Sequence, residues 1–232
     1  MTSGNIHDLE KLRERTGVFA DRRDAGRILA ALVAQEMLPE PLILAIPAGG
    51  VPVAAVLAEA LGAPLDVAVV SKITLPWNSE AGYGAVAFDG SYQLNEALIR
   101  SAGLSPQGVT QGIETTRRKV ANRVASFRAG HALPDLAVHD LVVVDDGLAS
   151  GFTMLVAIAA LQRAGARSIT VAVPTGHLKA VQRIAQEVAT VCCANLRSGT
   201  PYAVAAAYRH WTDVSEAEAL LVLAESAETR LS

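Results

Sequence analysis

The sequence has little cysteine and lacks a long apolar segment. Its 232 residues include two cysteines, Cys192 and Cys193, which are adjacent and so form neither a spaced disulfide framework nor a zinc quartet. The N-terminus has no apolar signal-peptide core, and the longest uncharged run, 41–58, contains three prolines and two glycines. We therefore expect a cytoplasmic protein that neither spans nor binds a membrane.

Charge of one sign and aromatic side chains are also scarce. The net charge is −3 and the pI is about 6.0, so the chain has no overall basic field, and nucleic acid is not an expected partner. Aromatic residues make up 4% of the chain, whereas hydrophobic residues make up 51%. This composition argues against disorder and predicts a core of alanine, valine, leucine and isoleucine.

Short apolar runs alternate with helical segments over much of the chain. Strands are expected at 42–46, 65–71, 141–145, 168–174 and 189–194, and helices at about 22–36, 52–61, 152–164, 177–187 and 215–227. Apolar strands that alternate with helices are typical of an α/β fold with a doubly wound, mostly parallel sheet covered on both faces.

The alternation stops between 73 and 139, which we interpret as an inserted, flexible flap. Residues 73–84 are expected to form a loop, and Asp89-Gly90 between two β-prone runs predicts a hairpin. A long helix is expected over about 106–128. Its basic residues fit a solvated face with a Glu114–Arg118 pair, and a surface for nucleic acid or a partner is the alternative.

Two adjacent carboxylates follow the buried strand of the segment LVVVDDGLASGFT, 141–153. Asp145 and Asp146 end the strand, and a glycine-containing turn then opens a helix. Such a turn directs backbone N–H groups and the positive helix end at one point, which suits a phosphate, and Ser150 and Thr153 add hydroxyls. Two carboxylates would repel a phosphate, so they suit the hydroxyls of an attached sugar and a Mg²⁺ ion.

This pattern resembles the signature of the type I phosphoribosyltransferases, and the similarity extends over most of the chain from about Phe19. The resemblance implies an enzyme that transfers the phosphoribosyl group of phosphoribosyl pyrophosphate to a nitrogenous base and releases pyrophosphate. By pattern, Asp145 and Asp146 hold the ribose hydroxyls and hold Mg²⁺, directly or through substrate and water. The implied substrate-binding loop comprises Gly147, Leu148, Ala149, Ser150, Gly151, Phe152 and Thr153.

A second loop and a lysine belong to the site that the resemblance implies. Ala48, Gly49 and Gly50 match the family's pyrophosphate loop, in which a non-proline cis peptide is expected on one side or the other of Gly49. Relatives usually carry Arg or Lys where Ala48 stands, so pyrophosphate binding should be weaker here. Lys72 is expected to face the pyrophosphate as a catalytic cation, and a surface lysine is the alternative.

The resemblance leaves the acceptor base open. Ala149 stands where relatives that act on 6-oxopurines usually carry Asp, which disfavours a 6-oxopurine. A small C-terminal hood, about 195–232, is expected near the base, where Tyr202, Tyr208 or Trp211 would stack on it, although ordinary packing explains these rings equally well. The whole chain, residues 1–232, is expected to be a single phosphoribosyltransferase-like domain, with the flap and the hood as additions, and to form a homodimer.

Two other functions fit parts of the sequence. A non-catalytic regulator that binds phosphoribosyl pyrophosphate or a nucleotide would fit Ala48 and the basic helix. A hydrolase would fit Ser150, but the nucleophile elbow needs Gly-x-Ser-x-Gly, whereas serine is fourth in GLASG. The histidines are scattered, and the two cysteines are expected to be small buried residues of a strand.

Overall fold

A six-stranded sheet with the strand order β1-β9-β8-β7-β2-β3 forms the centre of the computed structural model, which describes residues 5–229 except the side chains of Ser79, Glu80 and Thr229. Every neighbouring pair is parallel, which confirms the predicted sheet. Its strands are β1 (Ile6–His7), β2 (Pro41–Ala45), β3 (Leu65–Val67), β7 (Asp140–Val144), β8 (Ser168–His177) and β9 (Thr190–Arg197).

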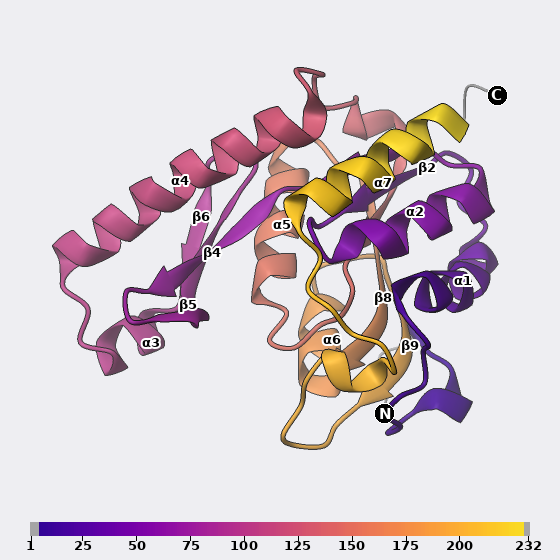
Figure 1. Ribbon diagram of the computed structural model, residues 1–232, viewed down its shortest axis with the longest axis horizontal. Helices are drawn as coiled ribbons and strands as arrows, with labels where there is room; N and C mark the ends of the chain where they lie inside the picture. Colours follow the sequence, from indigo (N-terminus) through magenta and orange to yellow (C-terminus); the bar gives the residue numbers. More distant parts are fainter. Residues whose placement is uncertain (1–4, 230–232) are drawn as a thin grey trace.

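Helices cover both faces of this sheet (Figure 1). Successive residues of a strand point to opposite faces, so Leu42 and Leu44 belong to one buried cluster and Ile43 and Ala45 to the other. One face is covered by α1 (Arg22–Val33), α2 (Gly50–Leu61) and α7 (Glu216–Thr229), and the other by α5 (Phe152–Arg163) and α6 (Leu178–Ile184). Short 3-10 helices occur at η1 (Glu10–Leu12), η2 (Ala34–Glu36), η3 (Leu136–Val138) and η4 (Ala205–Ala207).

Local signals explain several helix ends. Asp21 caps α1 by accepting a hydrogen bond from the backbone amide of Asp24 at 2.8 Å, and Gly62 ends α2 in the left-handed conformation. None of the described helices combines the length and the apolar character that crossing a membrane requires.

A separate three-stranded antiparallel sheet and a long helix form an arm that projects from the main sheet (Figure 1). The arm contains β4 (Val70–Leu75), β5 (Asn78–Ala87), β6 (Tyr92–Leu94), α3 (Glu96–Ser101) and α4 (Pro106–Arg128). The boundaries of α4 match the prediction because Ser105 caps the helix and Pro106 occupies its first turn. The hairpin at Asp89-Gly90 is also confirmed, with Val86 opposite Tyr92.

Three local predictions in and near the arm are wrong. Residues 73–84 are not a loop, because β4 and β5 pair through this stretch, and Gly84 packs so closely in its strand that a Cβ would lie 2.8 Å from the Gln93 carbonyl oxygen. The predicted strand 65–71 is divided between two sheets: residues 65–67 form β3 of the main sheet, and Val70 begins β4 of the arm. The run of apolar residues from 67 to 70 gives no local signal for this division. Glu114 pairs with Arg117, one helical turn away at 2.6 Å, and not with Arg118.

Candidate active site

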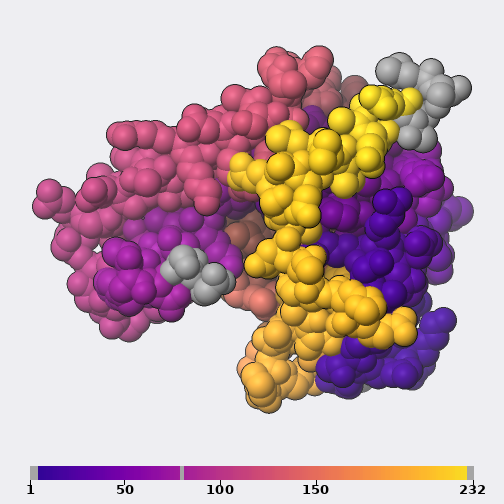
Figure 2. All heavy atoms as spheres, viewed as in Figure 1, coloured from indigo at the N-terminus to yellow at the C-terminus, as the bar shows by residue number. Residues whose placement is uncertain are grey.

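A cleft of about 500 Å³ lies between the main sheet and the arm. Figure 2 shows the surface recessed between the arm and the yellow C-terminal segment. The cleft is bordered by the segments that follow β2 and β7, and the carboxyl ends of parallel strands are where open α/β sheets bind ligands. Of the predicted site residues, the cleft is lined by Ala48, Gly49, Lys72, Asp145, Asp146 and Thr153.

The two carboxylates at the end of β7 carry more negative charge than their surroundings neutralise. Both Nε and Nη2 of Arg22 donate to one oxygen of Asp146, at 3.0 and 2.9 Å, and the Asp146 amide donates to Asp145 Oδ1 at 2.8 Å. Burial and the repulsion of Asp146 raise the pKa of Asp145 well above its ordinary value. Burial also raises the pKa of Asp146, against the opposing effect of Arg22. A cation in the cleft would therefore favour the ionised pair.

The two glycines after β2 pack directly against this pair. A Cβ on Gly49 would lie 2.2 Å from Asp146 Oδ2, and one on Gly50 would lie 2.7 Å from the Val144 carbonyl oxygen. Only glycine fits at this distance, so the loop and the carboxylates form one unit.

The cis peptide in this loop is not beside Gly49, as predicted, but between Pro47 and Ala48. Gly49 has ordinary helical dihedral angles and Gly50 is the first residue of α2. These glycines are therefore needed because they let the loop pack against the end of β7, and not because they adopt an unusual backbone conformation.

Arg123 links α4 to the loop after β2, to β4 and to the start of α7. Its Nη2 donates to the Pro47 carbonyl at 3.0 Å, its Nη1 to the Val70 carbonyl and to Ser71 Oγ at 3.0 and 2.9 Å, and its Nε to Glu216 at 2.6 Å. The predicted solvated helix face is thus wrong for Arg123, whose side chain is 11% exposed.

The helical spacing contains the signal that would have found Arg123. Arg123 follows the buried Val120 by three residues and precedes the buried Phe127 by four, so it lies on the buried face of α4. An arginine on an apolar stripe needs buried acceptors, and here they come from the loop and β4.

Two lysines supply unpaired positive charge to the cleft. Lys72 on β4 and Lys119 on α4 are exposed, line the cleft, and form no ion pair with any side chain that the structure describes. The charge of Lys72 also acts on Asp145 and favours its ionised form. Sequence reasoning identified Lys72 but did not single out Lys119, because the latter is one of several cations on α4.

The predicted phosphate loop divides into a buried half and an open half. The backbone of Leu148 pairs with β8, accepting from the His177 amide at 2.8 Å and donating to the Thr175 carbonyl at 2.9 Å. Ala149 and Ser150 are exposed, and Gly151 adopts a left-handed conformation immediately before α5. Of the loop's residues, Thr153 reaches the lining of the cleft, whereas Gly147 packs against Val204.

The three aromatic rings of the predicted hood have different environments. Tyr202 does not line the cleft: its hydroxyl lies 3.2 Å from Thr175 Oγ1 and its ring meets His177 edge-on. The Tyr208 hydroxyl donates to the Asp146 carbonyl at 2.6 Å from a buried position. Trp211 borders the cleft and lies under the guanidinium of Arg22, 3.8 Å from the ring centroid. Arg22, a cleft residue that sequence reasoning missed, thus has a fixed position.

Comparison with known proteins gives a consistent family. A family model described as phosphoribosyl transferase domain matches residues 89–207. Proteins from two strains of Mycobacterium tuberculosis, provisionally named phosphoribosyl transferases, are 35% identical over 209 residues, which cover 89% of this chain and 46% of theirs. The chain thus spans about half the length of these relatives. The crystal structure of TT1426 from Thermus thermophilus has a TM-score of 0.70 at 32% identity and covers 89% of this chain and 98% of that chain.

Proposed function

This chain belongs to the phosphoribosyl transferase family, and we propose that its cleft transfers a phosphoribosyl group from phosphoribosyl pyrophosphate to a nitrogenous base with the help of Mg²⁺. One observation carries the proposal: the paired carboxylates of β7, the glycine loop after β2 and the lysines of the arm converge on one cleft. In this arrangement Asp145 and Asp146 face the ribose hydroxyls. Ala149 to Thr153 face the 5′-phosphate, because the positive end of α5 and the backbone amides of its first turn suit that anion.

The cations of the arm compensate for the missing charge at Ala48. Lys72 and Lys119 approach the cleft from β4 and α4 without an ion-pair partner among the described residues, so both are free to bind the pyrophosphate. Arg123 cannot move to the substrate without breaking its bonds to Pro47 and Glu216, so it acts as a positioning residue. It fixes the arm against the loop.

The carboxylate pair fits a magnesium ion. Mg²⁺ prefers carboxylate oxygens, and Asp145 has no cation bonded to it within residues 5–229. Asp145 and Asp146 would hold the ion, with substrate oxygens and water as the other ligands. When bound, the metal neutralises charge on the departing pyrophosphate.

The protein's own task is to orient the two reactants and to exclude water. Pyrophosphate leaves C1 of the ribose, positive charge develops on the sugar ring, and a base nitrogen attacks the opposite face. Holding both reactants in place lowers the entropic part of the barrier, and a closed cleft protects the reactive sugar from hydrolysis. Trp211, which Arg22 already contacts on one side, is the aromatic residue of the hood that borders this space.

Turnover is tested by incubating the protein with phosphoribosyl pyrophosphate, Mg²⁺ and a panel of nucleobases, and by measuring pyrophosphate release. Asp145→Asn keeps an acceptor for the Asp146 amide but removes the charge, and we expect a loss of roughly 100-fold or more. Asp140→Asn, at the other end of the same strand, is the control and should retain activity. Equal activity in both variants would contradict the proposed role of the pair.

The lysines are tested in the same assay. Lys72→Met and Lys119→Met should each raise the KM for phosphoribosyl pyrophosphate, and the double variant should lose about tenfold or more in kcat/KM, equivalent to roughly 1.4 kcal/mol. Lys11→Met, on η1 outside the cleft, is the matched control. Tight Mg²⁺-dependent binding of phosphoribosyl pyrophosphate with no turnover of any base would support the regulator instead of the enzyme.

A further inference from the structure

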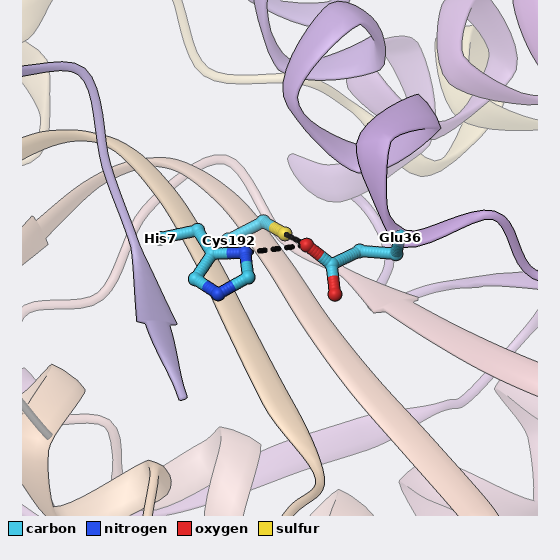
Figure 3. A group of neighbouring side chains, drawn as sticks. All are labelled: His7, Glu36 and Cys192. Atoms are coloured by element: carbon cyan, nitrogen blue, oxygen red, sulfur yellow. Dashed lines mark hydrogen bonds and ion pairs between the residues drawn. The ribbon is translucent and has the colours of Figure 1, made fainter. Parts of the chain in front are cut away.

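Three side chains that the proposed reaction does not use meet on the α1-covered face of the sheet. His7 lies on edge strand β1, Cys192 on β9, and Glu36 at the end of η2, immediately after α1. His7 and Cys192 are direct partners in the β1–β9 register, so their side chains lie side by side. Figure 3 shows the histidine ring and the thiol both directed at the Glu36 carboxylate.

The donor atoms of this cluster are close together. His7 Nδ1 lies 2.5 Å from Glu36 Oε1, Cys192 Sγ lies 4.0 Å from the same oxygen, and all three donor atoms lie within 4.8 Å of one another. An imidazole nitrogen, a carboxylate oxygen and a sulfur are the three ligand types that Zn²⁺ accepts, whereas Mg²⁺ prefers oxygen alone. The cluster therefore differs in metal preference from the carboxylates of the cleft.

Burial and charge set this cluster apart from a surface ion pair. The Glu36 side chain is 13% exposed and forms no ion pair with a lysine or arginine among the described residues, and its carboxylate faces His7 and a buried thiol. His7, with 42% of its side chain exposed, leaves a route from solvent to the donor atoms. A half-buried carboxylate whose partners are both metal-ligand types is suited to a cation.

We propose that His7, Glu36 and Cys192 bind one divalent transition-metal ion of the Zn²⁺ type, with a water molecule as the fourth ligand on the exposed side of His7. The metal fixes edge strand β1 and the end of η2 to β9, since one ligand comes from each segment. Burial and the nearby Glu36 carboxylate raise the pKa of the Cys192 thiol to about 12. Metal binding therefore releases that proton and converts the thiol to a thiolate.

The site is tested with Co²⁺ as a spectroscopic probe on the 232-residue chain without a histidine tag. In the presence of excess Mg²⁺, which occupies the carboxylates of the cleft, we expect one Co²⁺ per chain and a thiolate-to-cobalt charge-transfer absorption, both of which added Zn²⁺ removes. Cys192→Ser should abolish the absorption. Zn²⁺ should also raise the melting temperature of the wild-type protein but not that of Cys192→Ser.

The adjacent cysteine provides a matched control. Cys193 is equally buried but belongs to the opposite face of the sheet, where its thiol contacts the Asn195 carbonyl. Cys193→Ser should retain the cobalt absorption and the melting shift. His7→Gln, at a partly exposed position, should fold normally and lose stoichiometric binding, so the test remains decisive if the cysteine variants are unstable.

Two results would overturn the metal site and leave an ordinary His7–Glu36 ion pair. One is wild-type protein that binds Co²⁺ no more tightly than Cys192→Ser, and the other is binding without a thiolate band. The readouts do not depend on phosphoribosyl transfer, so they can fail or succeed separately from the proposed function.

Discussion

Arg22 donates two hydrogen bonds to a single oxygen of Asp146, although the two residues are 124 positions apart in the chain. The side chains are 9% and 16% exposed, so the pair is largely removed from water. Arg22 also donates to the Thr212 carbonyl at 2.7 Å, which fixes the start of α1, the end of β7 and the segment before α7 together. The pair therefore holds three segments around the cleft together and also neutralises the charge of Asp146.

Removing this guanidinium should destabilise the protein. Arg22→Met leaves the Asp146 carboxylate beside Asp145 without its ion-pair partner, and we expect a loss of about 3 kcal/mol in the free energy of unfolding, measured with urea. Arg27→Met, on the exposed side of the same helix, should change stability by less than about 0.5 kcal/mol. Similar losses in both variants would show that Arg22 stabilises the protein through helix α1 and not through its ion pair with Asp146.

Asp145 should destabilise the metal-free protein at neutral pH. Its pKa is raised in the folded state, so the folded protein holds this proton more tightly than the unfolded chain does. The free-energy cost of the buried Asp145 charge is fully present above the folded-state pKa. This cost decreases as the pH falls below the folded-state pKa, and it is absent below the ordinary pKa of an aspartate. Asp145→Asn should therefore unfold at higher urea concentration than wild type at pH 8, with a smaller difference at pH 5. A difference that is constant with pH, or that reverses sign, contradicts this account.

A methyl group at position 49 should damage the site. Gly49→Ala places a Cβ 2.2 Å from Asp146 Oδ2, so either the loop or the carboxylate must move. Because catalytic groups need precise placement, we expect at least a tenfold loss of kcat/KM, or about 1.4 kcal/mol, together with a lower melting temperature. Gly199→Ala adds the same methyl group where nothing lies within 4 Å, and should leave both properties unchanged.

Arg123 should affect both stability and the affinity for phosphoribosyl pyrophosphate. Arg123→Met removes four hydrogen bonds and leaves the carbonyls of Pro47 and Val70 without this donor, which should cost roughly 2–4 kcal/mol. Arg118→Met, on the exposed side of α4, is the control. Arg123→Lys should recover part of the stability but not the KM, because an ammonium cannot reproduce the planar set of donors. Full activity and stability in Arg123→Met would exclude a positioning role.

Local sequence patterns predicted five of the six strands of the main sheet, the boundaries of α4 and the hairpin at Asp89-Gly90, because each depends on residues close together in the chain. Edge strand β1 was not predicted, because its two residues form no apolar run. Asp145 and Asp146 were also found locally, as two charges at the end of an apolar strand. Arg22 and Arg123 were not found, since their partners lie far away in the sequence. The hairpin of β4 and β5 was missed because its glycines, which usually indicate turns, serve close packing inside a strand.

The cysteines show another limit of local reasoning. Both were correctly expected to be buried in a strand, but alternation sends them to opposite faces. Only Cys192 therefore meets His7 and Glu36. Neither partner is recognisable from the sequence, because the three residues come from separate elements.

The passage from β3 to β4 takes only residues 68 and 69, and it places the two sides of the cleft on different sheets. The carboxylates are built into one sheet and the two lysines into the arm, so no strand register sets the distance between the opposite charges. That distance depends on how the arm packs against the main sheet, where Arg123 bonds to the Pro47 carbonyl and to Glu216. Any shift of the arm relative to the main sheet would therefore change the spacing between the opposite charges, on which ligand affinity depends.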